Sequence, residues 1–118
     1  MTTLARAACL ALLAPGGHGR VAATMRAVPI IIPVTFVILG EDVVFSPGVG
    51  PGLSRAVADS VVAFEADQVG SDGQALWEVH VTGVARALTQ TTNAPDFRLS
   101  SEIIAGWRNE ASCHHARP

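Results

Sequence analysis

Apolar positions along this chain follow two rhythms, one helical near the start and one alternating through most of the rest. Four apolar residues near the start share one helical face: Leu4, Ala8, Ala11 and Leu12. Thr2 or Thr3 can cap this helix, which we expect to run to about Ala14 and to lie against a sheet. Pro15 and the two glycines that follow it end the helix.

Alternating and β-branched stretches predict a series of short strands. They cover Arg20–Arg26, Val28–Leu39, Val43–Phe45, Val61–Ala66, Leu76–Leu88 and Phe97–Trp107. Within Leu76–Leu88, Trp77, Val79 and Val81 fall on one side, whereas Glu78 and His80 fall on the other. Pro33 has no N–H for a strand ladder, so it predicts a bulge or bend.

The connections separate these strands without alternating helices. Ser46–Gly52 reads SPGVGPG, which is a loop, and a short helix is expected over Leu53–Asp59. Strands without βαβ alternation indicate a mainly β protein with an antiparallel barrel. We expect one domain over residues 1–108 and a disordered tail over 109–118.

Composition narrows the class of protein. The 118 residues are 49% hydrophobic and 15% charged, with a formal net charge of -2, as expected of a globular domain. A nucleic-acid partner would need clustered positive charge, which is absent, and the Val28–Leu39 run is too short to span a bilayer. We expect a cytoplasmic protein in which Cys9 and Cys113 are free thiols.

Five segments occur in an order that is similar to a known family: GRVA, VPIIIPVTFVI, VVAFEADQV, LWEVHVTGVA and SSEIIAGWR. Over roughly residues 4–108 the chain resembles the flavin-binding split β-barrel family that includes the pyridoxamine 5′-phosphate oxidases. The resemblance implies a split-barrel homodimer with two flavin sites at the subunit interface. It also implies that the cofactor phosphate lies at the glycine-rich turn.

This turn departs from the family pattern, which reads Phe-Arg-Thr-x-x-Gly-x-Lys-Leu. Here the Arg is Ser46, the Thr is Pro47 and the Lys is Gly52, so two cations and a hydroxyl are missing. Such charge-assisted bonds are worth about 1.5–3 kcal/mol each, so the phosphate clamp is weakened. The resemblance implies these cofactor-binding positions: Thr35, Ser46, Gly48, Gly50, Gly52, Leu53, Arg55 and Trp77.

Two functions remain open at this point. One is an oxidoreductase that binds FMN or a deazaflavin coenzyme and acts on a small-molecule substrate. The alternative is a non-enzymatic, degenerate split-barrel dimer that no longer binds a flavin tightly. The glycine-rich turn and Arg55 favour the first, whereas the changes at Ser46, Pro47 and Gly52 favour the second. Only TQTTNAP spans the gap before the closing strand, so one wall of the pocket is shortened.

A second group of chemically active residues stands in the tail. Cys113, His114, His115 and Glu110 are of metal-ligand types, but a structural zinc site needs four ligands on a rigid frame. No matching pair accompanies them, so we expect no metal site.

Overall fold

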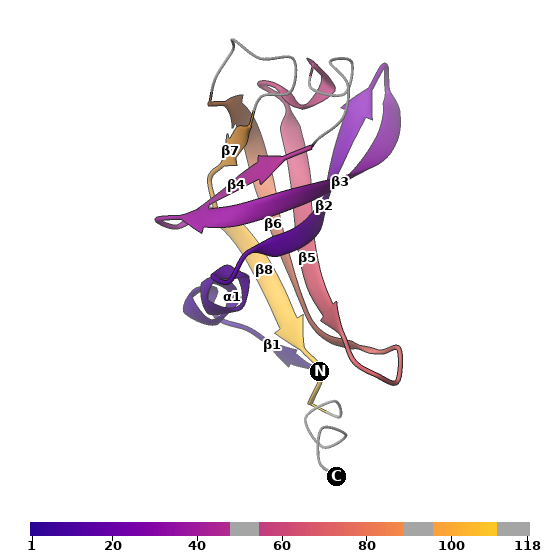
Figure 1. The fold of residues 1–118 in the computed structure, drawn as a ribbon, viewed down its shortest axis with the longest axis vertical. Coiled ribbons are helices and arrows are strands. Elements are labelled where there is room, and N and C mark those ends of the chain that lie inside the picture. The colour runs from indigo at the N-terminus through magenta and orange to yellow at the C-terminus, as the bar shows by residue number, and fades with distance from the viewer. Residues whose placement is uncertain (48–54, 89–95, 111–118) are drawn as a thin grey trace.

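The computed structural model describes residues 1–47, 55–88 and 96–110 (Figure 1). Its strands are β1 (Thr2–Thr3), β2 (Gly17–Met25), β3 (Val28–Leu39), β4 (Asp42–Ser46), β5 (Val61–Val69), β6 (Ala75–Ala87), β7 (Phe97–Leu99) and β8 (Ile103–Arg108). Helix α1 (Arg6–Leu13) stands between β1 and β2, and residues 55–57 are helical within the predicted short helix. No helix within the described ranges is long and apolar enough to cross a membrane.

The strands form one antiparallel sheet that closes on itself, which confirms the predicted barrel. The order is β1-β8-β6-β5-β2-β3-β4-β7, and an additional β6–β7 pairing closes a six-strand ring. Along one edge, strand β6 pairs with two different strands: its residues Trp77–Thr82 pair with β8, and its residues Ala85–Ala87 pair with β7. The barrel is therefore split along β6.

The core follows from the alternation that the sequence shows. On β3, Ile32, Val34 and Phe36 are buried, whereas the residues between them are exposed. The Phe36 and Phe64 rings pack edge to face with centroids 4.9 Å apart. The side chains of Val79 and Val81 point inward and His80 outward, as the pattern of Leu76–Leu88 predicts.

Strands β2 and β3 form a long hairpin whose tip projects beyond the barrel (Figure 1). Its two-residue turn, Arg26 and Ala27, has φ of 51° and 64°, the left-handed pair that a type I′ turn requires. The β2–β3 register passes Pro33 without a shift, so the predicted bulge is wrong. Because β4 pairs with β3 only from Thr35 onward, Pro33 can turn its missing N–H toward an edge that no described strand pairs with at this position.

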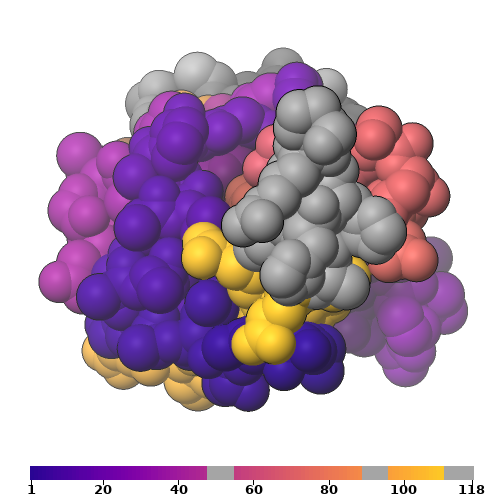
Figure 2. Space-filling model, turned by 90° about the horizontal axis from the view of Figure 1, so that it is seen from below, coloured from indigo at the N-terminus to yellow at the C-terminus, as the bar shows by residue number. Residues whose placement is uncertain are grey.

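The N-terminal prediction needs correction. Thr2 and Thr3 do not cap the helix, because they pair with β8 instead, and Ala5 stands at the N-cap without a side-chain hydrogen bond. Seen from below, the N-terminal residues and the C-terminal strand lie side by side (Figure 2). The helix does lie against the sheet, but its buried residues are Cys9 and Leu13, whereas Ala11 is exposed.

The predicted closing strand Phe97–Trp107 is also wrong in part, because it is two strands, β7 and β8. Ser101 lies between them and is 1% exposed. The Arg6 guanidinium donates to the Ser101 carbonyl and, over 2.9 Å, to its hydroxyl. These bonds hold the chain out of the ladder at the split. The predicted disordered tail covers residues 109–118, of which 109 and 110 are described, and the Asn109 N–H donates to the Leu76 carbonyl over 3.0 Å. Residues 111–118 and the shortened segment 89–95 lie outside the described residues.

Candidate functional site

A row of polar side chains crosses the outer face of the barrel where β4 ends. His18 on β2 pairs with Thr35 on β3, and Thr35 pairs with Ser46 on β4. The Ser46 hydroxyl donates to the carboxylate of Asp96, which directly precedes β7. We call these four residues the His18–Asp96 row. It offers an imidazole at one end, two hydroxyls in the middle and a carboxylate at the other end.

Buried aromatic rings fix this arrangement. Phe45 pairs with Phe97 in the β4–β7 ladder, and their stacked rings lie 5.6 Å apart with both residues fully buried. Because side chains alternate across a strand, the neighbouring residues Ser46 and Asp96 are turned to the outer face together. A change of register would place one of the two phenylalanines in water, so the core holds the row in place.

Two hollows meet at His18. The first, about 230 Å³, is lined by His18, Pro33, Val34, Thr35, Ser46 and Pro47. The second, about 460 Å³, is lined by Ala11, Leu12, Pro15, Gly16, His18, Phe36, Ala66, Asp67, Gln68 and Trp77. No described residue that lines either hollow is an arginine. Together the hollows offer a polar part and a partly aromatic part.

Several predicted site residues meet here. Thr35 and Ser46 are neighbours in the first hollow, and Trp77 is half-buried in the second, where its Nε1 donates to Gln68 over 3.0 Å. Arg55 is exposed and lines neither hollow. The four remaining positions, Gly48, Gly50, Gly52 and Leu53, lie outside the described residues.

The sequence reasoning missed both ends of the row. A two-residue turn at Arg26 and Ala27 would have paired His18 with Thr35, but no glycine or asparagine marks that turn. Asp96 follows the polar segment TQTTNAP, and nothing in the local sequence shows that it directly precedes a buried phenylalanine at the start of a strand.

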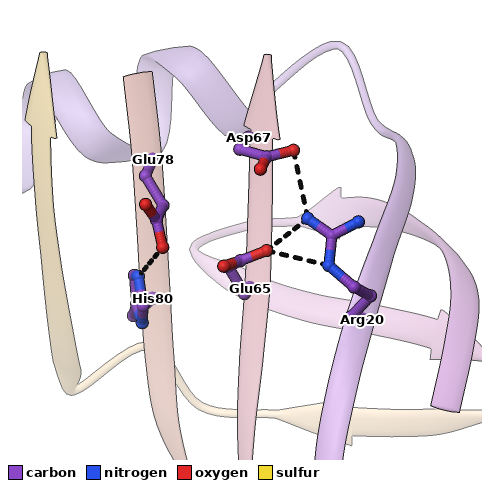
Figure 3. Close-up of polar contacts among 5 residues, drawn as sticks. All are labelled: Arg20, Glu65, Asp67, Glu78 and His80. Carbon is purple, nitrogen blue, oxygen red and sulfur yellow. Dashed lines mark hydrogen bonds and ion pairs between the residues drawn. The ribbon is translucent and has the colours of Figure 1, made fainter. Parts of the chain in front are cut away.

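A second polar cluster lies farther along the outer face, on β2, β5 and β6 (Figure 3). The Arg20 guanidinium contacts the carboxylate of Glu65 and, over 3.1 Å, that of Asp67. His80 Nε2 lies 2.6 Å from Glu78 Oε1. We call these five residues the Arg20 cluster.

The charges of the Arg20 cluster compensate one another. Burial alone would raise the pKa of Glu65, but its hydrogen bonds with Arg20 and Glu78 and the charges of Arg20 and His80 outweigh burial and lower it. Hydrogen bonds with Glu65 and Asp67 raise the pKa of Arg20. Ligand atoms of Glu65, Glu78 and His80 lie within 4.8 Å of one another, yet their groups are engaged in these contacts. The cluster is therefore an ion-pair network. The Cys113–His115 tail lies outside the described residues.

A third hollow, about 450 Å³, opens at the split of the barrel. Arg86 and Arg98 pair across β6 and β7 on its wall. Each guanidinium contacts a carboxylate, Asp59 at 2.8 Å for Arg86 and Asp42 at 2.7 Å for Arg98. The positive charge of the two arginines is thus balanced by Asp42, which lines the hollow, and by Asp59, which lies outside its lining.

The chain is similar in sequence to a known protein family and to a mycobacterial protein. The family model described as pyridoxamine 5′-phosphate oxidase matches residues 5–116. An uncharacterized protein of Mycobacterium tuberculosis, Rv0080, is 32% identical over 113 residues, which cover 92% of this chain and 72% of the relative.

Solved structures agree with that match. The FAD binding protein from Mycobacterium smegmatis is 31% identical, with a TM-score of 0.77, over 92% of this chain and 98% of that chain. A FAD-binding protein from Mesorhizobium loti is 19% identical, with a TM-score of 0.69, over 88% of this chain and 93% of that chain. The second likeness shows the fold alone.

Proposed function

The chain belongs to the pyridoxamine 5′-phosphate oxidase family, and on that premise we propose that it binds a flavin across the two hollows that meet at His18. The observation that carries the proposal is the 31% identity, over nearly the whole of both chains, to a protein described as FAD binding. A non-binding, degenerate barrel is not favoured by this likeness.

The residues present fit the chemical parts of a flavin. The second hollow offers apolar and aromatic surface from Leu12, Phe36 and Trp77, which suits a flat, partly apolar ring system. The first hollow offers the hydroxyls of Thr35 and Ser46, which suit a polar chain with hydroxyl groups. His18 adjoins both and can donate an N–H to an oxygen of the ligand.

Among flavins we propose FAD in preference to FMN. The phosphate of FMN is a monoester that carries close to two negative charges, whereas each phosphate of FAD is a diester with one. A dianion needs charge-assisted donors, and the described lining of the first hollow holds no arginine or lysine. The adenosine of FAD also adds contact surface. A deazaflavin coenzyme remains a further candidate.

A bound flavin would supply hydride or single-electron transfer, so we propose an oxidoreductase that acts on a small organic substrate. This chain's residues would bind and orient the cofactor. The described lining of both hollows holds one carboxylate, Asp67, and Arg20 engages it in an ion pair. We therefore assign no side chain to proton transfer.

Titration of purified protein with FAD, FMN and a deazaflavin coenzyme, followed by absorbance and fluorescence, tests the proposal. We expect FAD to bind and His18→Ala to weaken that binding about fivefold, since a hydrogen bond contributes about 1 kcal/mol. His80→Ala removes another exposed histidine from the outer face and should leave the affinity unchanged. If the wild-type protein binds no flavin, the degenerate-barrel alternative is correct.

A further inference from the structure

Asp96 closes one end of the His18–Asp96 row in a fixed position. Its backbone carbonyl accepts a hydrogen bond from the Leu88 N–H over 2.9 Å. Its carboxylate accepts the Ser46 hydroxyl, and the next residue, Phe97, is fully buried against Phe45. Backbone, side chain and neighbouring core residue therefore all hold the carboxylate beside Ser46, although Asp96 itself is exposed to solvent.

Asp96 borders the first hollow through Ser46, which lines it, so its carboxylate places a negative charge at this end of the hollow. Neighbouring strands are about 4.8 Å apart, so three strand spacings, roughly 14 Å, separate Asp96 from the imidazole of His18. The Ser46 hydroxyl between them is neutral and donates its proton to Asp96. A phosphate monoester placed beside Ser46 would meet a negative charge at short range, which disfavours it.

A carboxylate is a good partner for a different group. It accepts hydrogen bonds from sugar hydroxyls, as acidic residues do with ribose in dinucleotide-binding folds. The Thr35 hydroxyl can donate to the same sugar or accept from it, whereas Ser46, whose proton is donated to Asp96, can only accept. The row therefore offers a hydroxyl-binding surface at its Asp96 end.

The geometry points to Asp96 as a residue that determines ligand specificity: it excludes a phosphate monoester from this end of the first hollow and accepts hydroxyl groups of a flavin's sugar chain instead. This inference rests on the proposed function. We therefore expect the chain to prefer riboflavin or FAD to FMN, because neither riboflavin nor FAD carries a phosphate monoester.

The test compares FMN with riboflavin, because the two differ only by the phosphate. The ratio of their dissociation constants is measured by calorimetry for the wild-type protein and for Asp96→Asn, which keeps the shape and removes the charge. We expect the wild-type protein to bind FMN no more tightly than riboflavin. In Asp96→Asn, FMN should gain about tenfold relative to riboflavin, and the gain should shrink in high salt.

Two variants make the result specific. Asp72→Asn makes the same chemical change in the loop between β5 and β6, at the far end of these strands from β7 (Figure 1), and should leave the ratio unchanged. Ser46→Ala keeps the Asp96 charge but removes the hydroxyl, so the exclusion of FMN should persist. Circular dichroism of each variant verifies the fold.

The outcomes separate this inference from the proposed function. Suppose that the wild-type protein binds FAD or riboflavin. If the ratio of the FMN and riboflavin dissociation constants is then the same in Asp96→Asn as in the wild-type protein, only the role of Asp96 is overturned. The same holds if Asp72→Asn shifts this ratio as much as Asp96→Asn does. A wild-type preference for FMN over riboflavin overturns it as well. If the wild-type protein binds none of the three flavins, both proposals are overturned.

Discussion

At the scale of single residues, Glu65 shows how the outer face holds charge. It pairs with Arg20 on β2 and with His80 on β6, so a carboxylate stands between a permanent cation and a histidine. Its side chain is 28% exposed, which limits but does not remove solvent screening. Because the pKa of Glu65 is lowered in the folded protein, the charged form stabilises the fold.

The sign of the pH dependence follows. A lowered pKa contributes stability above the unfolded-state value, about 4.3 for Glu, and this contribution is lost as the pH falls through the folded value. Glu65→Gln should therefore cost about 1 kcal/mol at pH 7, and this cost should shrink as the pH falls below about 4.3 and disappear below the folded pKa of Glu65. Urea unfolding between pH 3 and pH 7 measures the difference. Glu102→Gln, at an exposed position without an ion pair among the described residues, should change stability by less than about 0.5 kcal/mol. A cost that is constant with pH would contradict the role of the Glu65 charge.

Residues of the candidate site were predictable to different degrees. Thr35 and Ser46 could be found because each stands in a segment that resembles a family motif. His18 and Asp96 could not, because their importance depends on register, which is set by a turn without glycine and by the buried pair Phe45 and Phe97. A residue's strand neighbours are a property of pairing rather than of local sequence.

At the scale of elements, the docking of α1 depends on a glycine in β8. A Cβ at Gly106 would lie 2.8 Å from Cys9 Sγ and 2.9 Å from the Glu78 carbonyl oxygen. The helix approaches the sheet closely only because this side chain is missing. Cys9 is buried there, and burial raises the pKa of its thiol, so it is a packing residue rather than a nucleophile.

Gly106→Ala should therefore push α1 away from the sheet. We expect a loss of about 2–3 kcal/mol in the free energy of unfolding, which urea titration measures. Gly83→Ala on β6 is the matched control, because its nearest contact is the end of the Leu99 side chain at 3.3 Å, which can move. It should cost less than about 1 kcal/mol. Equal losses at both positions would show that the contact with α1 is not the cause.

Elements themselves were predictable where the pattern is local. Val28–Leu39 and the alternating strand β6 follow directly from their side chains. The break between β7 and β8 was not predictable, because it depends on Arg6, which lies nearly the whole chain away in sequence and reaches Ser101 only once α1 has docked. The predicted N-cap of α1 was wrong for a similar reason, because Thr2 and Thr3 pair with β8, which is distant in sequence.

At the scale of the whole molecule, the barrel leaves an apolar stripe exposed. The register aligns Ile31, Ala22, Ala63, Thr82 and Ile103 across β3, β2, β5, β6 and β8. Ile31 is 73% and Ile103 65% exposed, and small residues lie between them. An exposed apolar stripe of this kind is typical of surfaces that bind another protein. The expected homodimer remains a prediction, and we propose this stripe as its contact.

Thr82→Arg places a charge within the stripe, next to Ile103, and should convert a dimer into a folded monomer. Light scattering measures the mass of the protein at tens of micromolar, which is on the order of ordinary assay concentrations. Leu39→Arg, which introduces the same charge at an exposed apolar position outside the stripe, should leave the mass unchanged. A wild-type monomer, or a dimer that survives Thr82→Arg, would count against the proposed contact.

The pairing of β1 with β8 also bears on how the protein is made. Ribosomes release a chain from its N-terminus, and here the second and third residues find their partners only at Trp107 and Arg108. The β6–β8 ladder and the seat of α1 are likewise incomplete until β8 has emerged. Because contacts distant in sequence form late, β1, α1 and the edge of β6 that faces β8 lack their partners until synthesis of β8 is finished, whereas consecutive strands can pair earlier.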